Sequence, residues 1–170
     1  MTYNFKDVKV LVVESSVPMF KLVQGVLAMF GVPENNVYAS YNIDDAFQKF
    51  RSIKHDLIIV DWLENPDRGI KLSRNLRTNK TTPNAYVPII MTAGSGHLNR
   101  VVKARDAGIS EYLVKPFSAK SLADRISRVI ERPRVFVVGD AYTGPERRVR
   151  SEGYTGPERR QSATPKPSKA

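Results

Sequence analysis

Between residue 8 and about residue 131, short β-branched apolar runs alternate with longer segments in which apolar residues recur every three or four positions. The first pattern is typical of strands and the second of amphipathic helices. Five such pairs follow one another, which predicts βα units around a parallel sheet. The predicted strands span residues 8–13, 37–41, 57–61, 89–92 and 111–114. The third and fourth are almost wholly apolar, as central strands buried on both faces should be.

The helical segments carry apolar stripes that should face the sheet. Two of these stripes are Val23, Val26, Leu27, Phe30 and Leu122, Ile126, Val129, Ile130; a partial one is Ile43, Phe47, Phe50. Asn42 and Ser118 stand where a side chain can cap a helix N-terminus. A doubly wound sheet built this way binds ligands beyond the carboxyl ends of its strands. We therefore expect the functional residues at those ends.

The character of the chain changes after Arg132. A short apolar run at 135–138 is followed by sequence rich in Gly, Pro, Arg and Ser, in which the heptapeptide YTGPERR begins at Tyr142 and again at Tyr154. The last residues, QSATPKPSKA, have a composition typical of disorder. We therefore predict one domain over residues 7–131 and a basic, largely irregular and flexible tail over residues 132–170.

Composition narrows the class of protein. A chain of 170 residues with 41% hydrophobic residues can build one ordinary core. It has no cysteine, which excludes disulfides and thiolate metal sites and fits a reducing compartment. Its start lacks the pattern of a signal peptide, and its apolar runs are too short to cross a bilayer. These features predict a soluble cytoplasmic protein with no membrane span.

The net charge of +10 is unevenly distributed. Residues 1–131 hold 18 basic and 13 acidic side chains, whereas residues 132–170 hold 9 and 4, so the shorter tail carries half of the excess. A basic tail is attracted to nucleic acid, an anionic surface or an acidic partner, but it can equally be a solvated extension without a partner.

Three charged residues follow predicted strands. Glu14 comes after the first, Asp61 ends the third, and Lys115 follows the fifth. A carboxylate can attack a phosphoryl group, and the charge that accumulates needs Mg²⁺ and a lysine to balance it. Mg²⁺ prefers carboxylate oxygens, which Glu14 and Asp61 offer. This set predicts a phosphoryl-accepting site.

The segments VLVVESS, LIIVDW, PIIM and YLVKPF, with Gly69 eight residues beyond Asp61, resemble the landmarks of response-regulator receiver domains over about residues 7–131. The resemblance implies a flavodoxin-like α/β fold, with a doubly wound parallel sheet in the order 2-1-3-4-5 and five helices. It also implies a non-enzymatic switch that receives its phosphoryl group from a histidine kinase or a phosphotransfer protein.

By the same resemblance, Asp61 is the phospho-acceptor, Lys115 the phosphate-sensing lysine and Tyr112 the aromatic switch. Glu14 is the first acid of the metal-binding pair, and the Leu63 carbonyl is the backbone metal ligand for Mg²⁺. The proline after the lysine usually follows a cis bond.

Three positions depart from the family pattern. Ser15 replaces the second acid, so Mg²⁺ binding should be weak and Ser15 at most a weak ligand. A gap-free count puts Ala93 where a phosphoryl-binding hydroxyl is expected, with Thr92 one residue early and aimed away unless the strand bulges. The proline expected four residues after the acceptor is Pro66, five residues after it.

Two other functions remain open beside the phosphorylation switch. The protein can be a pseudo-receiver adaptor that acts with little phosphorylation, as Ser15 and Ala93 suggest, or it can bind nucleic acid or an anionic surface through its tail. No DNA-binding motif follows the receiver, so a switch would act by binding an output protein that the sequence does not identify.

The repeated heptapeptide is a candidate recognition element for an acidic or phosphate-bearing partner. Its candidate contact residues are Tyr142, Arg147, Arg148, Tyr154, Arg159 and Arg160. The alternative is that residues 135–138 and the first copy fold back on the domain and the second copy is a neutral duplication. His55 and His97 lack metal-ligand spacing, and we assign them no role.

Overall fold

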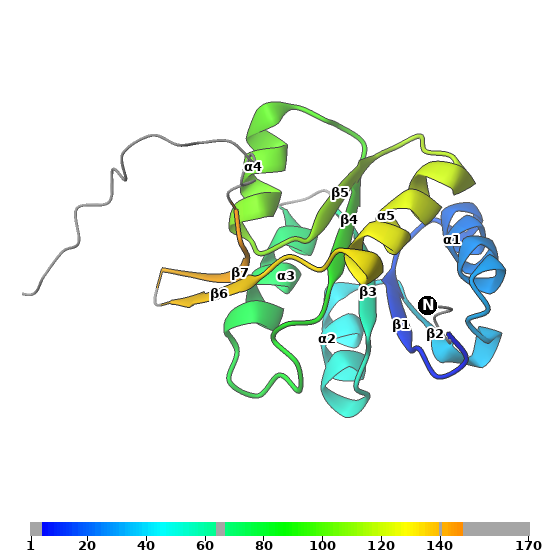
Figure 1. Cartoon of the computed structure of the whole chain (residues 1–170), viewed down its shortest axis with the longest axis horizontal. Coiled ribbons are helices and arrows are strands. Elements are labelled where there is room, and N and C mark those ends of the chain that lie inside the picture. Colours follow the sequence, from blue (N-terminus) through cyan, green and yellow to red (C-terminus); the bar gives the residue numbers. More distant parts are fainter. Residues whose placement is uncertain (1–4, 64–66, 140, 148–170) are drawn as a thin grey trace, which may run out of the picture.

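The computed structural model describes residues 5–63, 67–139 and 141–147. Its central feature is a five-stranded parallel sheet in the order β2-β1-β3-β4-β5, which confirms the predicted topology (Figure 1). The strands are β1 (Val10–Val13), β2 (Val37–Ser40), β3 (Leu57–Asp61), β4 (Ile89–Ala93) and β5 (Glu111–Val114). The helices are α1 (Val17–Met29), α2 (Ile43–Ser52), α3 (Arg68–Thr78), α4 (Leu98–Asp106) and α5 (Ala119–Glu131), with a short 3-10 turn at Glu34–Asn36.

Helices cover both faces of the sheet. α1 and α5 pack on one face, and α2, α3 and α4 on the other (Figure 1). Alternate residues of β1 enter opposite cores: Val10 and Val12 join α1 and α5, whereas Leu11 and Val13 join the other layer. This alternation follows from the two-residue period of a strand, and it explains why the central strands are apolar at every position.

Helix starts are set by the predicted caps. The Asn42 side chain accepts the Asp45 N–H at 2.9 Å, and Ser118 forms a reciprocal capping box with Ser121. Such bonds satisfy N–H groups that have no partner within the helix. Within the described part of the chain, no helix is long and apolar enough to cross a membrane.

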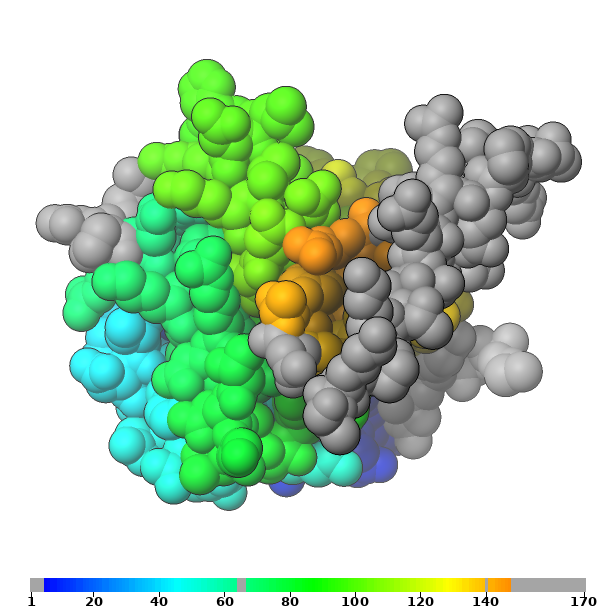
Figure 2. Space-filling view, turned by 90° about the vertical axis from the view of Figure 1, so that its left-hand side faces the viewer, coloured from blue at the N-terminus to red at the C-terminus, as the bar shows by residue number. Residues whose placement is uncertain are grey.

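Part of the segment after α5 folds back on the domain, which is one of the two alternatives that the sequence left open, whereas composition alone predicts an irregular tail. Strands β6 (Phe136–Gly139) and β7 (Tyr142–Pro145) pair as an antiparallel hairpin. The hairpin packs against the receiver beside α3 and α4 (orange in Figure 2). The first YTGPERR copy therefore contains a strand and folds back on the domain; the second copy lies outside the described residues.

Two glycines allow this packing. Gly108, with φ of +82°, would place a Cβ 2.9 Å from the Thr143 carbonyl oxygen, and a Cβ on Gly144 would lie 2.7 Å from the Gly108 Cα. A Cβ at either position would come too close to the opposing backbone, and the positive φ of Gly108 disfavours any other residue there as well. Gly144 of the heptapeptide thus serves close packing, and with Pro145 it lies within strand β7.

Candidate functional site

The carboxyl edge of the sheet brings together the charged residues singled out in the sequence. Asp61 is the last residue of β3, Glu14 directly follows β1, and Lys115 directly follows β5. Val13 pairs with Val60, so Glu14 and Asp61 come next on neighbouring parallel strands. Their convergence is a consequence of parallel register.

Lys115 contacts both carboxylates. Its Nζ lies 2.6 Å from Glu14 Oε2 and 2.9 Å from Asp61 Oδ1. The side chains of Lys115, Glu14 and Asp61 are 20%, 5% and 16% exposed, so the three charges lie in a shielded pocket. Burial disfavours the ammonium, but hydrogen bonds to Glu14 and Asp61 outweigh it and raise the pKa of Lys115 above its usual value. The lysine therefore stays charged and holds both acids in place. The peptide bond between Lys115 and Pro116 is cis, as the resemblance implied.

Thr92 lies beside Asp61. The two residues are register partners in β3 and β4, and the Thr92 hydroxyl is 3.5 Å from Asp61 Oδ1. Register partners on parallel strands project to the same side of the sheet. The gap-free count predicts that the Thr92 side chain points away from the site. In the structure it lies beside Asp61, and it is Ala93 that packs in the core cluster beneath α2, α3 and α4.

The loop after β3 is held close to the acid. The Leu63 N–H donates to Asp61 Oδ2 at 3.2 Å, with Leu63 at φ of 49°. A Cβ on Gly69 would lie 2.3 Å from the Asp61 carbonyl oxygen, so only glycine lets the start of α3 approach β3 this closely. Pro66 lies outside the described residues.

The donor set fits a magnesium site with few protein ligands. Glu14 and Asp61 supply hard oxygen ligands, and the fact that one ammonium contacts both shows that one cation can reach both. The Leu63 carbonyl accepts the Arg68 N–H at 3.2 Å, which leaves it one lone pair. Ser15 is exposed, and the described residues contain no group of three or more His, Cys, Asp and Glu that could hold a metal.

Tyr112, the expected switch residue, is half-buried beside this site. Its hydroxyl donates to the Ser95 carbonyl at 2.6 Å, and its ring meets the Trp62 ring edge-on at 6.5 Å. The Arg100 guanidinium lies over the Trp62 ring, 5.0 Å from the ring centroid. Trp62 Nε1 also donates to Asp67 at 3.1 Å.

Sequence reasoning did not assign roles to Trp62, Arg100 and Asp67. Trp62 directly follows Asp61 and is the only tryptophan in the chain, a signal that could have been used. Arg100 in α4 and Asp67 just before α3 carry no comparable signal, since single charged residues at such positions are usually solvated.

Of the tail candidates, Tyr142 and Arg147 lie within the described residues. The Tyr142 hydroxyl donates to the Pro145 carbonyl at 2.7 Å, and the Arg147 guanidinium lies 4.2 Å from the Tyr142 ring centroid. Arg147 also pairs with Asp106 at 2.9 Å. Arg148, Tyr154, Arg159 and Arg160 lie outside the described residues.

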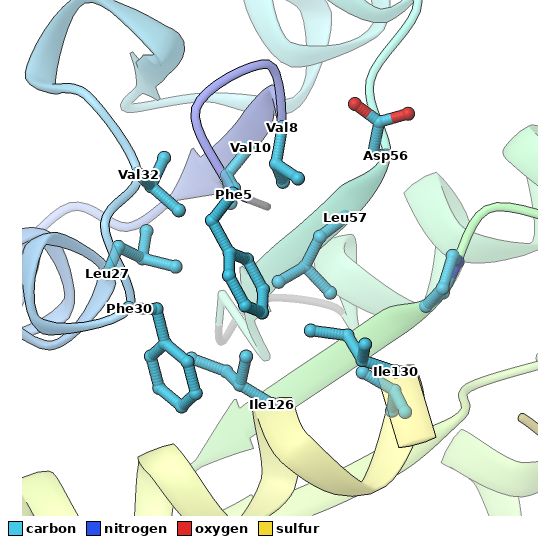
Figure 3. Close-up of a pocket in the computed structure, with 12 residues that line it drawn as sticks. Phe5, Val8, Val10, Leu27, Phe30, Val32, Asp56, Leu57, Ile126 and Ile130 are labelled. Atoms are coloured by element: carbon cyan, nitrogen blue, oxygen red, sulfur yellow. The ribbon is translucent and has the colours of Figure 1, made fainter. Parts of the chain in front are cut away.

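An apolar pocket of about 120 Å³ lies between α1 and α5, at the amino ends of β1 and β3 (Figure 3). The Phe5 ring lies between Leu57 and Ile126 in this view. Asp56 is the only charged residue among the described ones that line it, and its carboxylate accepts the Lys9 N–H at 2.9 Å. The pocket is at the opposite edge of the sheet from Asp61 and brings no reactive groups together.

Comparison with known proteins gives one family. A model of the response regulator receiver domain matches residues 10–127. The chemotaxis protein CheY-3 of Vibrio cholerae is 26% identical over 127 residues, 75% of this chain and 95% of that protein. The phosphate regulon transcriptional regulatory protein PhoB of Pseudomonas aeruginosa is 28% identical over 72% of this chain and 52% of that protein.

Solved structures agree with the observed fold. A response regulator from Thermotoga maritima has a TM-score of 0.63 at 27% identity and is aligned over 73% of this chain and 98% of its own. The chemotaxis response regulator CheY4 of Vibrio cholerae has a TM-score of 0.63 at 24% identity, over 72% of this chain and 98% of that one. At that identity the second likeness concerns the fold alone.

Proposed function

The chain belongs to the response regulator receiver family, the non-enzymatic signalling modules of two-component systems, and from this premise we propose that it is a switch phosphorylated on Asp61. The observation that carries the proposal is the contact of Lys115 with both Glu14 and Asp61 in one shielded pocket. The division into a receiver over residues 7–131 and a tail over residues 132–170 is part of this proposal.

The chemistry follows from the pocket. An oxygen of the Asp61 carboxylate attacks the phosphorus of a phosphohistidine on a histidine kinase or a phosphotransfer protein. An O–P bond forms as the N–P bond breaks, and the imidazole leaves with that electron pair and takes up a proton. Lys115 donates a hydrogen bond to an oxygen of the arriving phosphoryl group. In doing so, Lys115 gives up its contact with one of the two carboxylates.

Thr92 and the metal ligands complete the proposal. The Thr92 hydroxyl, already within 3.5 Å of Asp61, donates to a second phosphoryl oxygen. Glu14, Asp61 and the Leu63 carbonyl would hold Mg²⁺, which would supply positive charge near the phosphoryl oxygens. Ser15 can add at most a neutral hydroxyl, so metal affinity is low.

Tyr112 links the pocket to a surface that a partner can read. It packs on Trp62, the neighbour of Asp61, and holds the Ser95 carbonyl in the loop before α4. A change at Asp61 therefore reaches the surface of α4 and β5 through two contacts, and output follows by protein binding.

A pseudo-receiver adaptor is the second candidate function, and Ser15 is the observation that favours it. Intact-mass measurement after incubation with acetyl phosphate and Mg²⁺ separates the two. We expect an acid-labile gain of one phosphoryl group that Asp61→Asn abolishes. Asp56→Asn, at the other end of β3, should keep it. No gain in the unmodified chain would favour the adaptor, and a gain that persists in Asp61→Asn would refute the assignment of the acceptor.

A further inference from the structure

Five arginines line one cleft on the surface formed by α4, β5 and α5. They come from three parts of the chain: Arg105 from α4, Arg125 and Arg128 from α5, and Arg134 and Arg147 from the segments that flank the hairpin. The cleft has a volume of about 310 Å³, which is at the lower end of small-molecule sites. The arginines of the tail thus help to build a site on the receiver.

The arginines form two clusters, each around one acid. Arg125 Nη1 is 2.8 Å from the buried Glu111 carboxylate, and Arg128 and Arg134 each approach it to 3.6 Å. This carboxylate is 6% exposed, whereas the three arginine side chains are 32–53% exposed. The acid therefore fixes the guanidinium groups from below and leaves their outer edges open to the cleft.

The second cluster surrounds Asp106. Arg147 Nη1 and Arg105 Nη2 lie 2.9 and 3.1 Å from the same oxygen of Asp106. Burial disfavours the charge on Asp106, but hydrogen bonds from Arg147 and Arg105 outweigh it and hold the pKa of Asp106 below its usual value. Among the described residues, the five lining arginines therefore contact two carboxylates, that of Glu111 in the lining and that of Asp106 beside it, an excess of three positive charges.

We propose that this cleft binds a small molecule that carries at least two phosphate groups. Arginine presents a planar fork of N–H donors that matches phosphate oxygens, and no lysine is among the described residues that line the cleft. Two clusters suit two anionic groups on one ligand. Val101, Ala104 and Ile109 add an apolar wall, which suits the non-phosphate part of such a ligand.

Surface ion pairs alone do not require this arrangement. Two arginines would neutralise Glu111 and Asp106, and exposed ion pairs contribute little to stability. The remaining three positive charges repel one another across the cleft, an energetic cost that a bound polyanion removes.

The test is to titrate the full chain with inorganic triphosphate in isothermal titration calorimetry. Mg²⁺ and phosphodonors are left out, so that phosphorylation of Asp61 does not contribute to the signal. We expect saturable binding that Arg128→Gln weakens about tenfold, the loss of about 1.4 kcal/mol of charge-assisted hydrogen bonding. Arg128 is half-exposed and its contact with Glu111 is long, so this substitution should leave the fold intact.

Two controls separate the cleft from net charge. Arg74→Gln removes the same charge from an exposed position on α3, and a double Arg159→Gln, Arg160→Gln variant removes charge from the second heptapeptide. Each should change the affinity less than twofold per charge. The proposal is overturned if either control weakens binding as much as Arg128→Gln does, or if no binding is measured. It is also overturned if hexaglutamate binds in place of triphosphate, a result that would assign the cleft to an acidic protein segment.

Discussion

His55 should make the protein lose stability as the pH falls below neutral. The ring is fully buried at the start of β3, stacked on Phe50 at 6.0 Å and edge-on to Tyr38 at 5.1 Å. Neither ring nitrogen has a hydrogen-bond partner among the described residues, although the carbonyl of Ile53 is near enough to favour the charged form slightly. Burial dominates and lowers the pKa of His55 to about 4.

The size and the sign of the effect follow from linkage. In the unfolded chain a histidine binds its proton near pH 6.5, well before His55 does in the fold, so acid favours the unfolded state. The contribution of neutral His55 to the free energy of unfolding is complete above pH 6.5 and is lost as the pH falls towards 4. The full loss is about 3 kcal/mol, and about 2 kcal/mol of it falls between pH 7 and pH 5. The pKa values of Asp45, Asp67 and Asp106 are lowered from 3.8, so their contributions are lost only below this window.

Urea unfolding at pH 7, 6 and 5 measures the effect, with the fluorescence of the buried Trp62 as signal. His55→Phe keeps the stacking on Phe50 and should abolish most of the change between pH 7 and pH 5. His97, the only other histidine, is exposed, and His97→Gln should behave as the unmodified chain. The reasoning is wrong if the stability of His55→Phe and of the unmodified chain falls equally over this range.

Three further outcomes follow from the structure. Ser15→Asp should tighten Mg²⁺ binding at least tenfold in a titration followed by Trp62 fluorescence, because it adds a carboxylate beside Glu14; unchanged affinity would show that position 15 does not face the metal. In urea unfolding, Gly69→Ala should lower the free energy of unfolding by about 1–3 kcal/mol, because the new Cβ would clash with the Asp61 carbonyl oxygen. Gly25→Ala in α1 has open space around its Cβ and should raise the free energy of unfolding by up to about 1 kcal/mol. The same sign for both glycines would contradict the close approach.

The fold could be predicted because its signals are local and repeated. Two-residue and 3.6-residue periods identify the five units, and the caps at Asn42 and Ser118 set helix starts without tertiary information. Strand ends shifted by one or two residues: β1 begins at Val10, not at residue 8, and β4 reaches Ala93. Strand ends depend on pairing with neighbours, which a single sequence does not show.

Thr92 shows why spacing along the chain alone mispredicts the direction of one side chain at the edge of the sheet. Counting along the chain assumed a fixed length between Pro88 and Gly108, whereas the position of a side chain at the sheet edge is set by register with β3. Because strand side chains alternate, an error of one residue reverses the direction of the side chain. The direction of the Thr92 side chain becomes clear only from the pairing of Thr92 with Asp61.

For a different reason, the sequence left open whether the hairpin segment is irregular or folds back on the domain. Three of the four residues of β6 are exposed, and the two strands are rich in Gly and Pro, so composition alone favours irregular structure. What orders them is tertiary: Phe136 packs on Tyr86 at 5.3 Å, and the Arg77 guanidinium lies 5.0 Å from the Phe136 ring centroid. Arg77 donates to carbonyl oxygens of Ala85, Val87 and Gly108 in the receiver, and its burial lowers its pKa to about 10.

The neutral Ser15, at a position where the family usually has an acid, changes the net charge of the proposed acceptor pocket. Glu14, Asp61 and Lys115 leave the pocket with one net negative charge, and a second acid at position 15 would add another. An added carboxylate attracts Mg²⁺ more strongly, but it also repels the anionic phosphoryl group that must approach Asp61. In the proposed site, serine would weaken metal binding and lower this repulsion together, so that Lys115 would bear a larger share of the charge balance than it would beside a pair of acids.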